Sequence, residues 1–266
     1  YRIMDCSCSG CVHTGCYQDE TKGKEMKKIM GVLGVVFCLM LAGCASQKQD
    51  TIEKRNTDIS KDQTYDHSME LEYAKMFAVD YYQNDYALVT IADDGKYLIV
   101  PEGESVPEDM DKDITVLQQP IQNIYLAASA AMDMFVATDA LDAVRFSSLK
   151  ADGWYIEEAK KAMEDGDIIY AGKYSAPDYE MILNENCGLA IENTMILHTP
   201  EVKEQMEKFN IPVLVDHSSY ETNPLGRTEW VKLYGLLTGH EDQAEQAFDA
   251  EAKAFEHVSD QDATGK

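Results

Sequence analysis

Basic side chains are scarce in this chain of 266 residues, which has 23 lysines and arginines against 48 aspartates and glutamates and a formal charge of -25. A chain of this charge repels polyphosphate, so a protein that binds nucleic acid through electrostatic attraction is excluded. Hydrophobic residues nevertheless make up 45% of the sequence. That content rules out a collagen-like or wholly disordered polymer and predicts a globular protein.

Catalytic motifs and a disulfide framework are also missing. Downstream of Cys44 there is no phosphate-binding loop, dinucleotide-binding glycine motif, nucleophile elbow or metalloprotease helix. Four of the seven cysteines precede Met26, Cys38 lies in an apolar run, and the remaining two are Cys44 and Cys187. The pattern therefore predicts neither a disulfide scaffold nor an enzyme of one of these classes.

A targeting signal is present near Met26. Two lysines follow this methionine, and an apolar run covers residues 29–42. The run has the length of the apolar part of a secretion signal and is short for a helix that spans ~30 Å of hydrocarbon. It closes on Leu41, Ala42, Gly43 and Cys44, which resembles the lipobox of bacterial lipoproteins. The resemblance implies cleavage before Cys44, a lipid on Cys44, and a location outside the cytoplasm on the cell membrane.

The remaining sequence predicts an α/β fold. Residues 76–82, 86–91 and 97–100 are rich in β-branched and aromatic side chains and predict a small antiparallel β-meander. Short apolar runs then alternate with helical patterns, which predicts a sheet of parallel strands flanked by helices. The expected strands are residues 114–117, 123–126, 144–146, 168–171, 188–191 and 213–215, and the expected helices are residues 130–137, 156–164, 179–183 and 201–209.

A long helix is expected to follow the last strand. Trp230, Leu233, Tyr234 and Leu237 share one helical face, and Gly239 interrupts the pattern before a second apolar stripe. The whole chain is then expected to divide into six parts: an upstream segment (1–25), a signal peptide (26–43), a polar tether (44–67), an N-terminal α/β lobe that includes the meander (68–228), a connecting helix (229–258), and the start of a second lobe (259–266).

Polar and aromatic residues follow three of the expected strands, at the ends where α/β folds bind ligands. Hydroxyl groups and cations suit an oxygen-rich or anionic ligand, and aromatic faces stack on planar ligands. For His217 and its neighbours, capping of a helix by Ser218 or Ser219 is an equally simple role. The candidate ligand-binding residues are Arg145, Phe146, Ser147, Ser148, Lys173, Tyr174, Ser175, His217, Ser218, Tyr220 and Glu221.

Three stretches, residues 138–146, 174–180 and 213–230, resemble the substrate-binding lipoproteins of ABC importers, in the class that carries iron-siderophore, haem or cobalamin. The resemblance implies two α/β lobes joined by a rigid helix, with the ligand between them and Arg227 among its contacts. It implies a monomer that lacks a cofactor and a metal site of its own, and whose partners are an ABC permease and its ATPase. Here the second lobe would be missing from the chain.

The resemblance also implies a docking residue. Glu180 corresponds to an exposed glutamate that engages arginines of the permease, although a glutamate there also complements the dipole of a helix N-terminus. We therefore expect a binding protein without catalytic activity, most simply one for a ferric siderophore. The alternatives are an exported hydrolase, with Ser147, Ser218 or Ser219 as nucleophile and His217 as base, and a structural surface lipoprotein.

Overall fold

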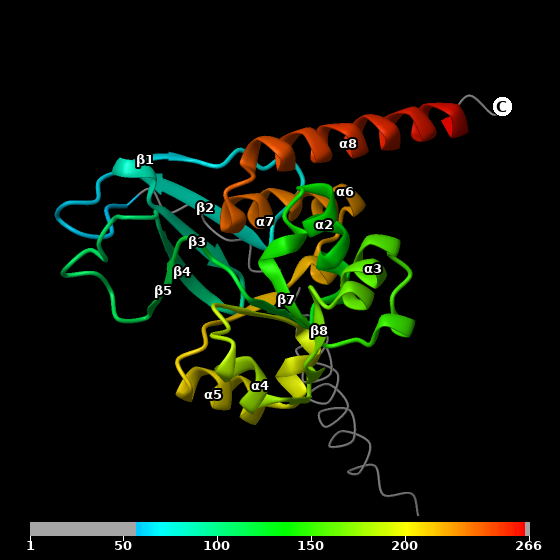
Figure 1. Ribbon diagram of the computed structural model, residues 1–266. Helices are drawn as coiled ribbons and strands as arrows, with labels where there is room; N and C mark the ends of the chain where they lie inside the picture. Colours follow the sequence, from blue (N-terminus) through cyan, green and yellow to red (C-terminus); the bar gives the residue numbers. More distant parts are fainter. Residues whose placement is uncertain (1–56, 264–266) are drawn as a thin grey trace, which may run out of the picture. The chain divides into compact units, whose positions relative to one another are not determined.

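A computed structural model describes residues 57–263 of the chain, with side chains through residue 258. The predicted upstream segment and signal peptide, the lipidation of Cys44 and most of the predicted tether lie outside these residues. Within them the chain forms two five-stranded sheets and a small hairpin. The predicted α/β class, with a meander before a parallel sheet, is confirmed (Figure 1).

The first sheet contains the predicted meander and two additional strands. In the order β1-β2-β3-β4-β5 its strands are Tyr65–Ser68, Phe77–Tyr82, Ala87–Ile91, Gly95–Val100 and Ile114–Gln118. β1 begins in the range predicted as a tether (44–67), ends one residue beyond it, and pairs antiparallel with β2. β5 pairs parallel with β4, so this strand extends the meander and does not belong to the second sheet. The proline-rich loop between β4 and β5 supplies the crossover that a parallel pair requires.

The second sheet is parallel throughout and has the order β12-β11-β6-β7-β8. Its strands are, in chain order, β6 (Ile124–Leu126), β7 (Val144–Ser147), β8 (Ile169–Tyr170), β11 (Ala190–Asn193) and β12 (Val213–Asp216). The helices between them are α2 (Met132–Ala137), α3 (Glu157–Asp165), α4 (Tyr179–Asn184) and α5 (Pro200–Lys208). All five strands and all four helices overlap the ranges expected from the sequence.

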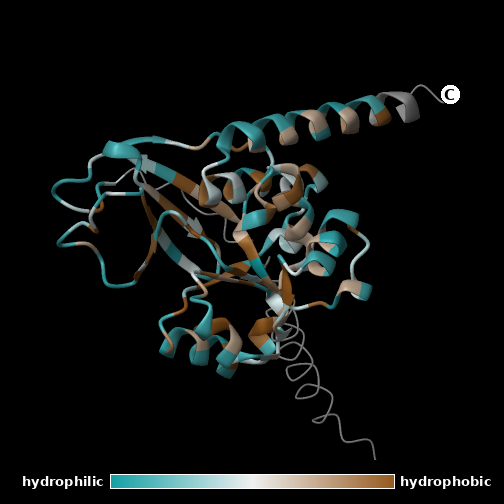
Figure 2. Cartoon of the chain, in the orientation of Figure 1, coloured by the Kyte–Doolittle hydropathy of each residue, from teal (hydrophilic) through white to brown (hydrophobic). Residues whose placement is uncertain are grey.

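Apolar side chains cover both faces of the second sheet. Ile124, Leu126 and Leu214 point to one face and share a core with α2, α3, α7 and the first sheet. Tyr125 and Val213, one residue out of phase, point to the other face, where α4 and α5 cover them. Figure 2 shows the apolar strands between helices whose outer sides are hydrophilic. The alternation of side chains along each strand therefore separates two helical layers.

The first sheet also closes one edge of the second. Asp94, in the turn between β3 and β4, accepts hydrogen bonds from the Val215 amide (3.1 Å) and from the Lys203 ammonium (2.6 Å). The Tyr97 hydroxyl donates to the Val213 carbonyl at 2.7 Å. These contacts satisfy backbone groups of the edge strand β12, which would otherwise be open to pairing with another chain.

The C-terminal region forms three helices: α6 (Pro224–Glu229), α7 (Val231–Thr238) and α8 (Glu241–Ala263). Gly239 ends α7 in the left-handed region, at φ 75°, as expected from the interruption of the apolar pattern. α8 continues beyond residue 258, the expected end of the connecting helix. None of the helices described in residues 57–263 is both long and apolar enough to cross a membrane.

Candidate functional site

The order of the second sheet reverses between β6 and β11. From β6 the chain proceeds outward through β7 to β8, and then returns to place β11 and β12 on the other side. The segments after β6 and β11 lead to helices on opposite faces of the sheet. In parallel sheets this arrangement leaves a crevice at the carboxyl ends of the strands, where ligands bind. We call the segments that follow the five strands the carboxyl edge.

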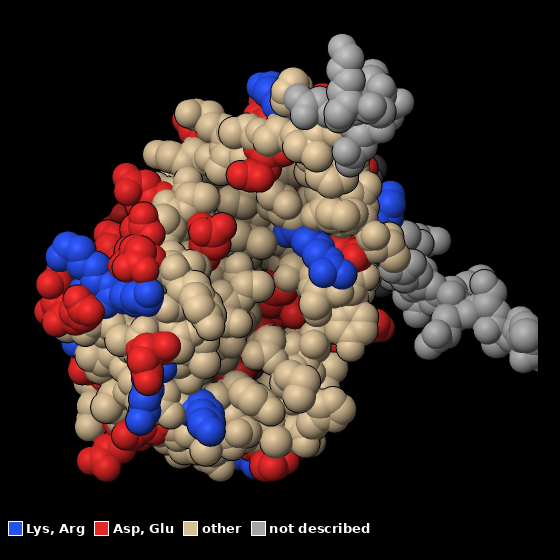
Figure 3. All heavy atoms as spheres, turned by 90° about the vertical axis from the view of Figure 1, so that its right-hand side faces the viewer, with Lys and Arg blue, Asp and Glu red and all other residues tan. Residues whose placement is uncertain are grey.

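The carboxyl edge carries large apolar side chains that lack cover. Tyr155 is 95% exposed, and Met195, Leu197 and Tyr220 are each about half exposed, at 49%, 52% and 55%. They lie in the segments after β7, β11 and β12. Figure 3, which views the molecule from the right-hand side of Figure 1, shows a broad area with few charged side chains and a hollow with acidic side chains inside. Exposed apolar side chains at the ends of parallel strands make the carboxyl edge the candidate binding surface.

The predicted residues after β7 are mostly used inside the fold. Phe146 is fully buried beneath α4 and α5. The Ser147 hydroxyl donates to the Leu149 carbonyl (2.8 Å) and accepts from the Trp154 indole (3.1 Å), and Ser148 is also buried. Ser147 therefore shapes the turn at the carboxyl edge, holds Trp154 in place and is not a free ligand-binding or nucleophilic hydroxyl.

Arg145 is not at the carboxyl edge. Its guanidinium donates to Glu185 Oε2 and to the carbonyls of Gly166 and Asp167, each at 2.7 Å, and these partners precede β8 and β11. The side chain therefore lies at the opposite, amino edge of the sheet, because Arg145 is near the beginning of β7. Its prediction as a ligand-binding residue is wrong.

Replacement of Arg145 by alanine should accordingly lower stability and leave ligand binding unchanged. The loss of three charge-assisted hydrogen bonds, partly open to solvent, is expected to reduce the free energy of unfolding by about 1 to 2 kcal/mol. Urea denaturation measures the first effect, and a ligand titration measures the second. A loss of affinity without a loss of stability would return Arg145 to the ligand site.

Lys173, Tyr174 and Ser175 form the tip of a hairpin after β8. Its two short strands are β9 (Gly172–Lys173) and β10 (Ala176–Pro177). Gly172 has φ 87°, and a Cβ there would lie 2.4 Å from the Ala176 carbonyl oxygen, so the hairpin requires glycine. Lys173 is exposed, whereas Tyr174 packs partly against the core. The hairpin thus presents Lys173 and Ser175 at the carboxyl edge.

His217 and Ser218 follow β12 and are both buried. The Ser218 amide donates to Asp216 Oδ1 at 2.7 Å, and the short 3-10 helix Ser218–Tyr220 follows. Burial lowers the pKa of His217, and its Nε2 has no hydrogen-bond partner among the described residues. No hydrogen bond joins His217 to a serine side chain in that part of the chain, so the pair that a hydrolase would need is not formed there.

Glu221 is a structural residue, contrary to its prediction as a ligand contact. Its carboxylate accepts hydrogen bonds from the amides of Lys75 and Met76 at 2.8 to 2.9 Å and from the Trp230 indole at 3.1 Å. The side chain is 2% exposed. These bonds tie the entry to β2 to the end of β12, so no oxygen is free for a ligand. Arg227, by contrast, is exposed one turn into α6 and donates to the Glu221 carbonyl at 3.3 Å.

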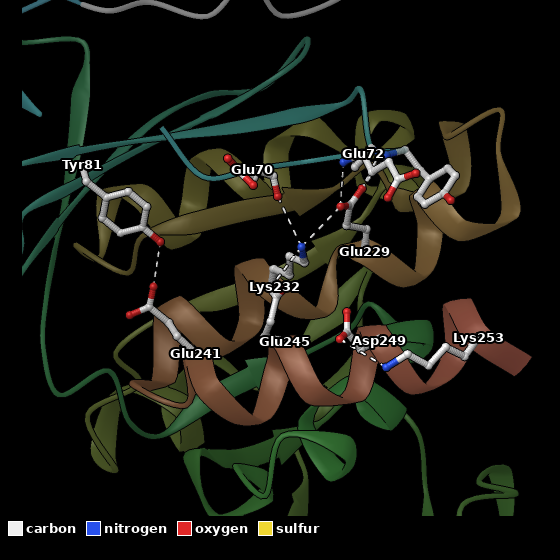
Figure 4. A network of polar contacts seen from close by, with 11 residues as sticks. Glu70, Glu72, Tyr81, Glu229, Lys232, Glu241, Glu245, Asp249 and Lys253 are labelled. Carbon is white, nitrogen blue, oxygen red and sulfur yellow. Dashed lines mark hydrogen bonds and ion pairs between the residues drawn. The ribbon is translucent and has the colours of Figure 1, made fainter. Parts of the chain in front are cut away.

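A second buried carboxylate works beside Glu221. Glu229 is fully buried and accepts hydrogen bonds from three successive amides, those of Glu72 (2.9 Å), Tyr73 (2.8 Å) and Ala74 (2.7 Å). Lys232 lies 3.5 Å from Glu229 and 3.1 Å from Glu245 of α8 (Figure 4). This group fixes α6, α7 and α8 to the first sheet and thereby holds the carboxyl edge in place.

The central part of the carboxyl edge contains residues that the sequence did not single out. The Asn193 side chain donates to the Ala127 carbonyl at 3.0 Å and so bridges the two strands of the switch point. Ser129 after β6 is exposed, and Lys150 after β7 lies 5.5 Å from the centre of the Tyr170 ring. The sequence did not single out these residues because their position depends on which strands are neighbours in the sheet. The apolar run of a strand does not reveal its neighbours.

Glu180 lies where the sequence places it, in the first turn of α4. Asp178 caps this helix by accepting a hydrogen bond from the Met181 amide at 3.1 Å, and Glu180 is exposed. Because the cap is supplied by Asp178, the Glu180 carboxylate is free to meet another protein. Among the described residues, no three His, Cys, Asp or Glu side chains form a group that could hold a metal ion.

Comparison with known proteins finds relatives among lipoproteins. Lipoprotein MJ0878 of Methanocaldococcus jannaschii is 23% identical over 255 residues, which cover 84% of this chain and 60% of the relative. Lipoprotein MJ0872 of the same organism is 21% identical over 240 residues, which cover 86% of this chain and 59% of the relative. The chain thus spans about 60% of the length of these relatives. No family model matches it.

Solved structures of binding proteins are also similar. MolA of Haemophilus influenzae, a molybdate periplasmic binding protein of an ABC transporter, has a TM-score of 0.44 and 12% identity over 53% of this chain and 49% of MolA. Holo-ViuP has a TM-score of 0.41 and 21% identity over 53% and 46% of the two chains. SirA of Staphylococcus aureus, complexed with staphyloferrin B, has a TM-score of 0.34 and 20% identity over 47% and 39%. The relatives found by sequence are named lipoproteins, as the lipobox resemblance at Cys44 leads one to expect.

Proposed function

We propose that this chain belongs to a lipid-anchored substrate-binding protein of an ABC importer, which works outside the cytoplasm and performs no catalysis. The full-length protein would capture a metal chelate, with a ferric siderophore as the first candidate and haem or cobalamin as the others. It would then deliver the chelate to a permease driven by its ATPase. Cys44 would carry the anchoring lipid.

The carboxyl edge is the observation that carries this proposal. Five parallel strands end at this edge, with the switch point between β6 and β11. The segments that follow the strands present an exposed aromatic at Tyr220, a cation at Lys173 and further exposed apolar side chains. This combination suits a large ligand with aromatic and oxygen-rich parts. A second wall would complete the cleft, and the additional length of the relatives leaves room for one.

Fluorescence titration tests the proposal. The full-length protein is titrated with a ferric catecholate siderophore, a ferric hydroxamate siderophore, haem and cobalamin, and one of them should quench its fluorescence with saturation. Tyr220→Ala should weaken this binding about tenfold, because an aromatic contact is lost. Phe209→Ala, at the far end of α5, is the matched control and should leave the affinity unchanged. Failure of all four probes to bind, or equal effects of both variants, would reject the proposal.

The proposed docking role of Glu180 has a separate test. In the full-length protein Glu180→Arg should leave ligand affinity intact and reduce uptake by at least about tenfold. The reason is that the arginines of the permease would attract Glu180 and repel an arginine at the same position. Glu185→Arg would be a poor control since Glu185 pairs with Arg145, so Glu201→Arg, at the start of α5, is used. Uptake that is unchanged by Glu180→Arg would remove this assignment.

A further inference from the structure

Glu192 is a buried acid without a partner. It is the third residue of β11, at the switch point of the second sheet, and its exposed fraction is 0%. Neither carboxyl oxygen has a hydrogen-bond partner among the described residues. Buried polar groups in folded proteins are almost always paired, so an exception at the centre of a candidate site points to a function.

Within the described part of the chain, no lysine or arginine forms a hydrogen bond with Glu192. The side chain lies on the face covered by α4 and α5, because Ala190, two residues earlier, points there. The titratable groups around it are Tyr125 of β6 and Tyr179 of α4, then Tyr170 and Cys187 beside Tyr125, and Glu201 of α5 beside Tyr179. Lys203 of α5 is paired with Asp94 at 2.6 Å.

At this buried position without a partner, the protonated, uncharged form of Glu192 is more stable than the carboxylate. Burial raises the pKa of Glu192 to about 8. Above that value a carboxylate would lie in an apolar layer without a counter-charge, which is costly unless water or a donor reaches it. Loosening of the layer over Glu192 when the proton leaves would relieve this cost, because it would let water reach the carboxylate.

We propose that Glu192 is a proton-binding site that controls how firmly α4 is held on the second sheet. Of the two covering helices α4 is the weaker, since it has six residues and buries Ile182 alone, whereas α5 has nine and buries Val202 and Met206. Burial, and next the charge of Glu192, raise the pKa of Tyr179, the first residue of α4. The weaker covering helix thus begins beside the acid.

The consequence for transport rests on the proposed function. α4 carries Glu180, so protonation of Glu192 would keep the permease-docking surface in place and loss of the proton would release it. The coupling between Glu192 and α4 does not depend on that function. If the ligand titration fails, the proposed function is rejected but the coupling is not. If the hydrogen-exchange experiment fails, the coupling is rejected but the proposed function is not.

Hydrogen exchange of the full-length protein tests the coupling. The amide of Ile182, which donates to the Asp178 carbonyl at 3.1 Å, reports on the opening of α4. If opening releases the proton of Glu192, the protection of this amide, corrected for chemical exchange, should fall about a hundredfold between pH 6 and pH 8. Glu192→Gln, which cannot ionise, should abolish this dependence. Glu201→Gln, an exposed acid near the same tyrosine, should keep it.

A second measurement uses the wild type alone and therefore tests the proposal even if Glu192→Gln does not fold. The infrared spectrum of the folded wild type at pH 7 should contain the band of a protonated carboxylic acid, and this band should disappear above about pH 9. Three results would overturn the proposal: protection of Ile182 that is independent of pH, the same pH dependence in folded Glu192→Gln, or the absence of a protonated-acid band at pH 7.

Discussion

Replacement of Glu229 by glutamine should lower the free energy of unfolding by about 3 to 5 kcal/mol, the range for breaking a buried ion pair. The wild-type carboxylate accepts from the amides of three successive residues and pairs with Lys232. A glutamine offers one oxygen, and its NH2 group would face the N–H groups of the three amides, so buried amides lose their acceptor. Lys232 loses its buried counter-charge and keeps only Glu245 and the Glu70 carbonyl as partners.

Urea denaturation of the full-length protein measures this effect. Glu245→Gln is the matched control, because Glu245 pairs with the same lysine but its side chain is 60% exposed. The control should cost less than about 1 kcal/mol. Equal midpoints for Glu229→Gln and the wild type would show that the bonds between α6 and the entry to β2 do not stabilise the fold.

Glu192 should make the protein less stable as the pH rises. Its pKa is about 8 in the folded state and about 4.3 in an unfolded chain. Between these values the folded state binds one proton more than the unfolded state, so the free energy of unfolding falls by up to ~1.4 kcal/mol per pH unit. The stabilisation that comes from the proton on Glu192 is fully present below the unfolded pKa of about 4.3. It is lost as the pH rises to and beyond the folded pKa of about 8.

Comparison with Glu192→Gln isolates this effect from the general repulsion within an acidic chain. The stability of the variant relative to the wild type should increase by up to ~1.4 kcal/mol per unit from about pH 5 to pH 8 and then level off. Glu192→Leu should be at least as stable as the wild type at pH 8, since an apolar residue can replace an unpartnered acid there. Parallel profiles for the wild type and Glu192→Gln would contradict a buried, uncharged Glu192.

The secondary structure could largely be predicted from the sequence because its signals are local. The apolar run of β12 and the helical spacing after Trp230 need only neighbouring residues, and Gly239 ends α7 through its own backbone freedom. The parallel sheet followed from the alternation of strands and helices. β5 was assigned to the wrong sheet because an apolar run does not reveal which strand it pairs with, and β5 pairs with β4, the strand directly before it.

The candidate site was only partly predictable for the same reason. Tyr220 and Lys173 follow strands and are exposed, as expected. Arg145 was wrongly predicted as a ligand contact because it lies near the beginning of β7 and not at its carboxyl end. Glu221 was wrongly predicted because its partners, Lys75 and Met76, lie more than a hundred residues earlier in the chain. The sequence did not indicate that Glu192 is buried, because the strand expected at residues 188–191 ends just before it and an acid at that place is normally exposed.

Paramagnetic broadening in NMR spectra tests the central claim, that a ligand is held at the carboxyl edge, most directly. A ferric siderophore that binds the full-length protein should broaden the amide signals of Ser129, Asn193 and Tyr220, which follow β6, end β11 and follow β12. Signals of Asn123 and Gly166, at the amino edge, should stay sharp. Broadening at the amino edge instead, or spread evenly over both edges, would contradict the account.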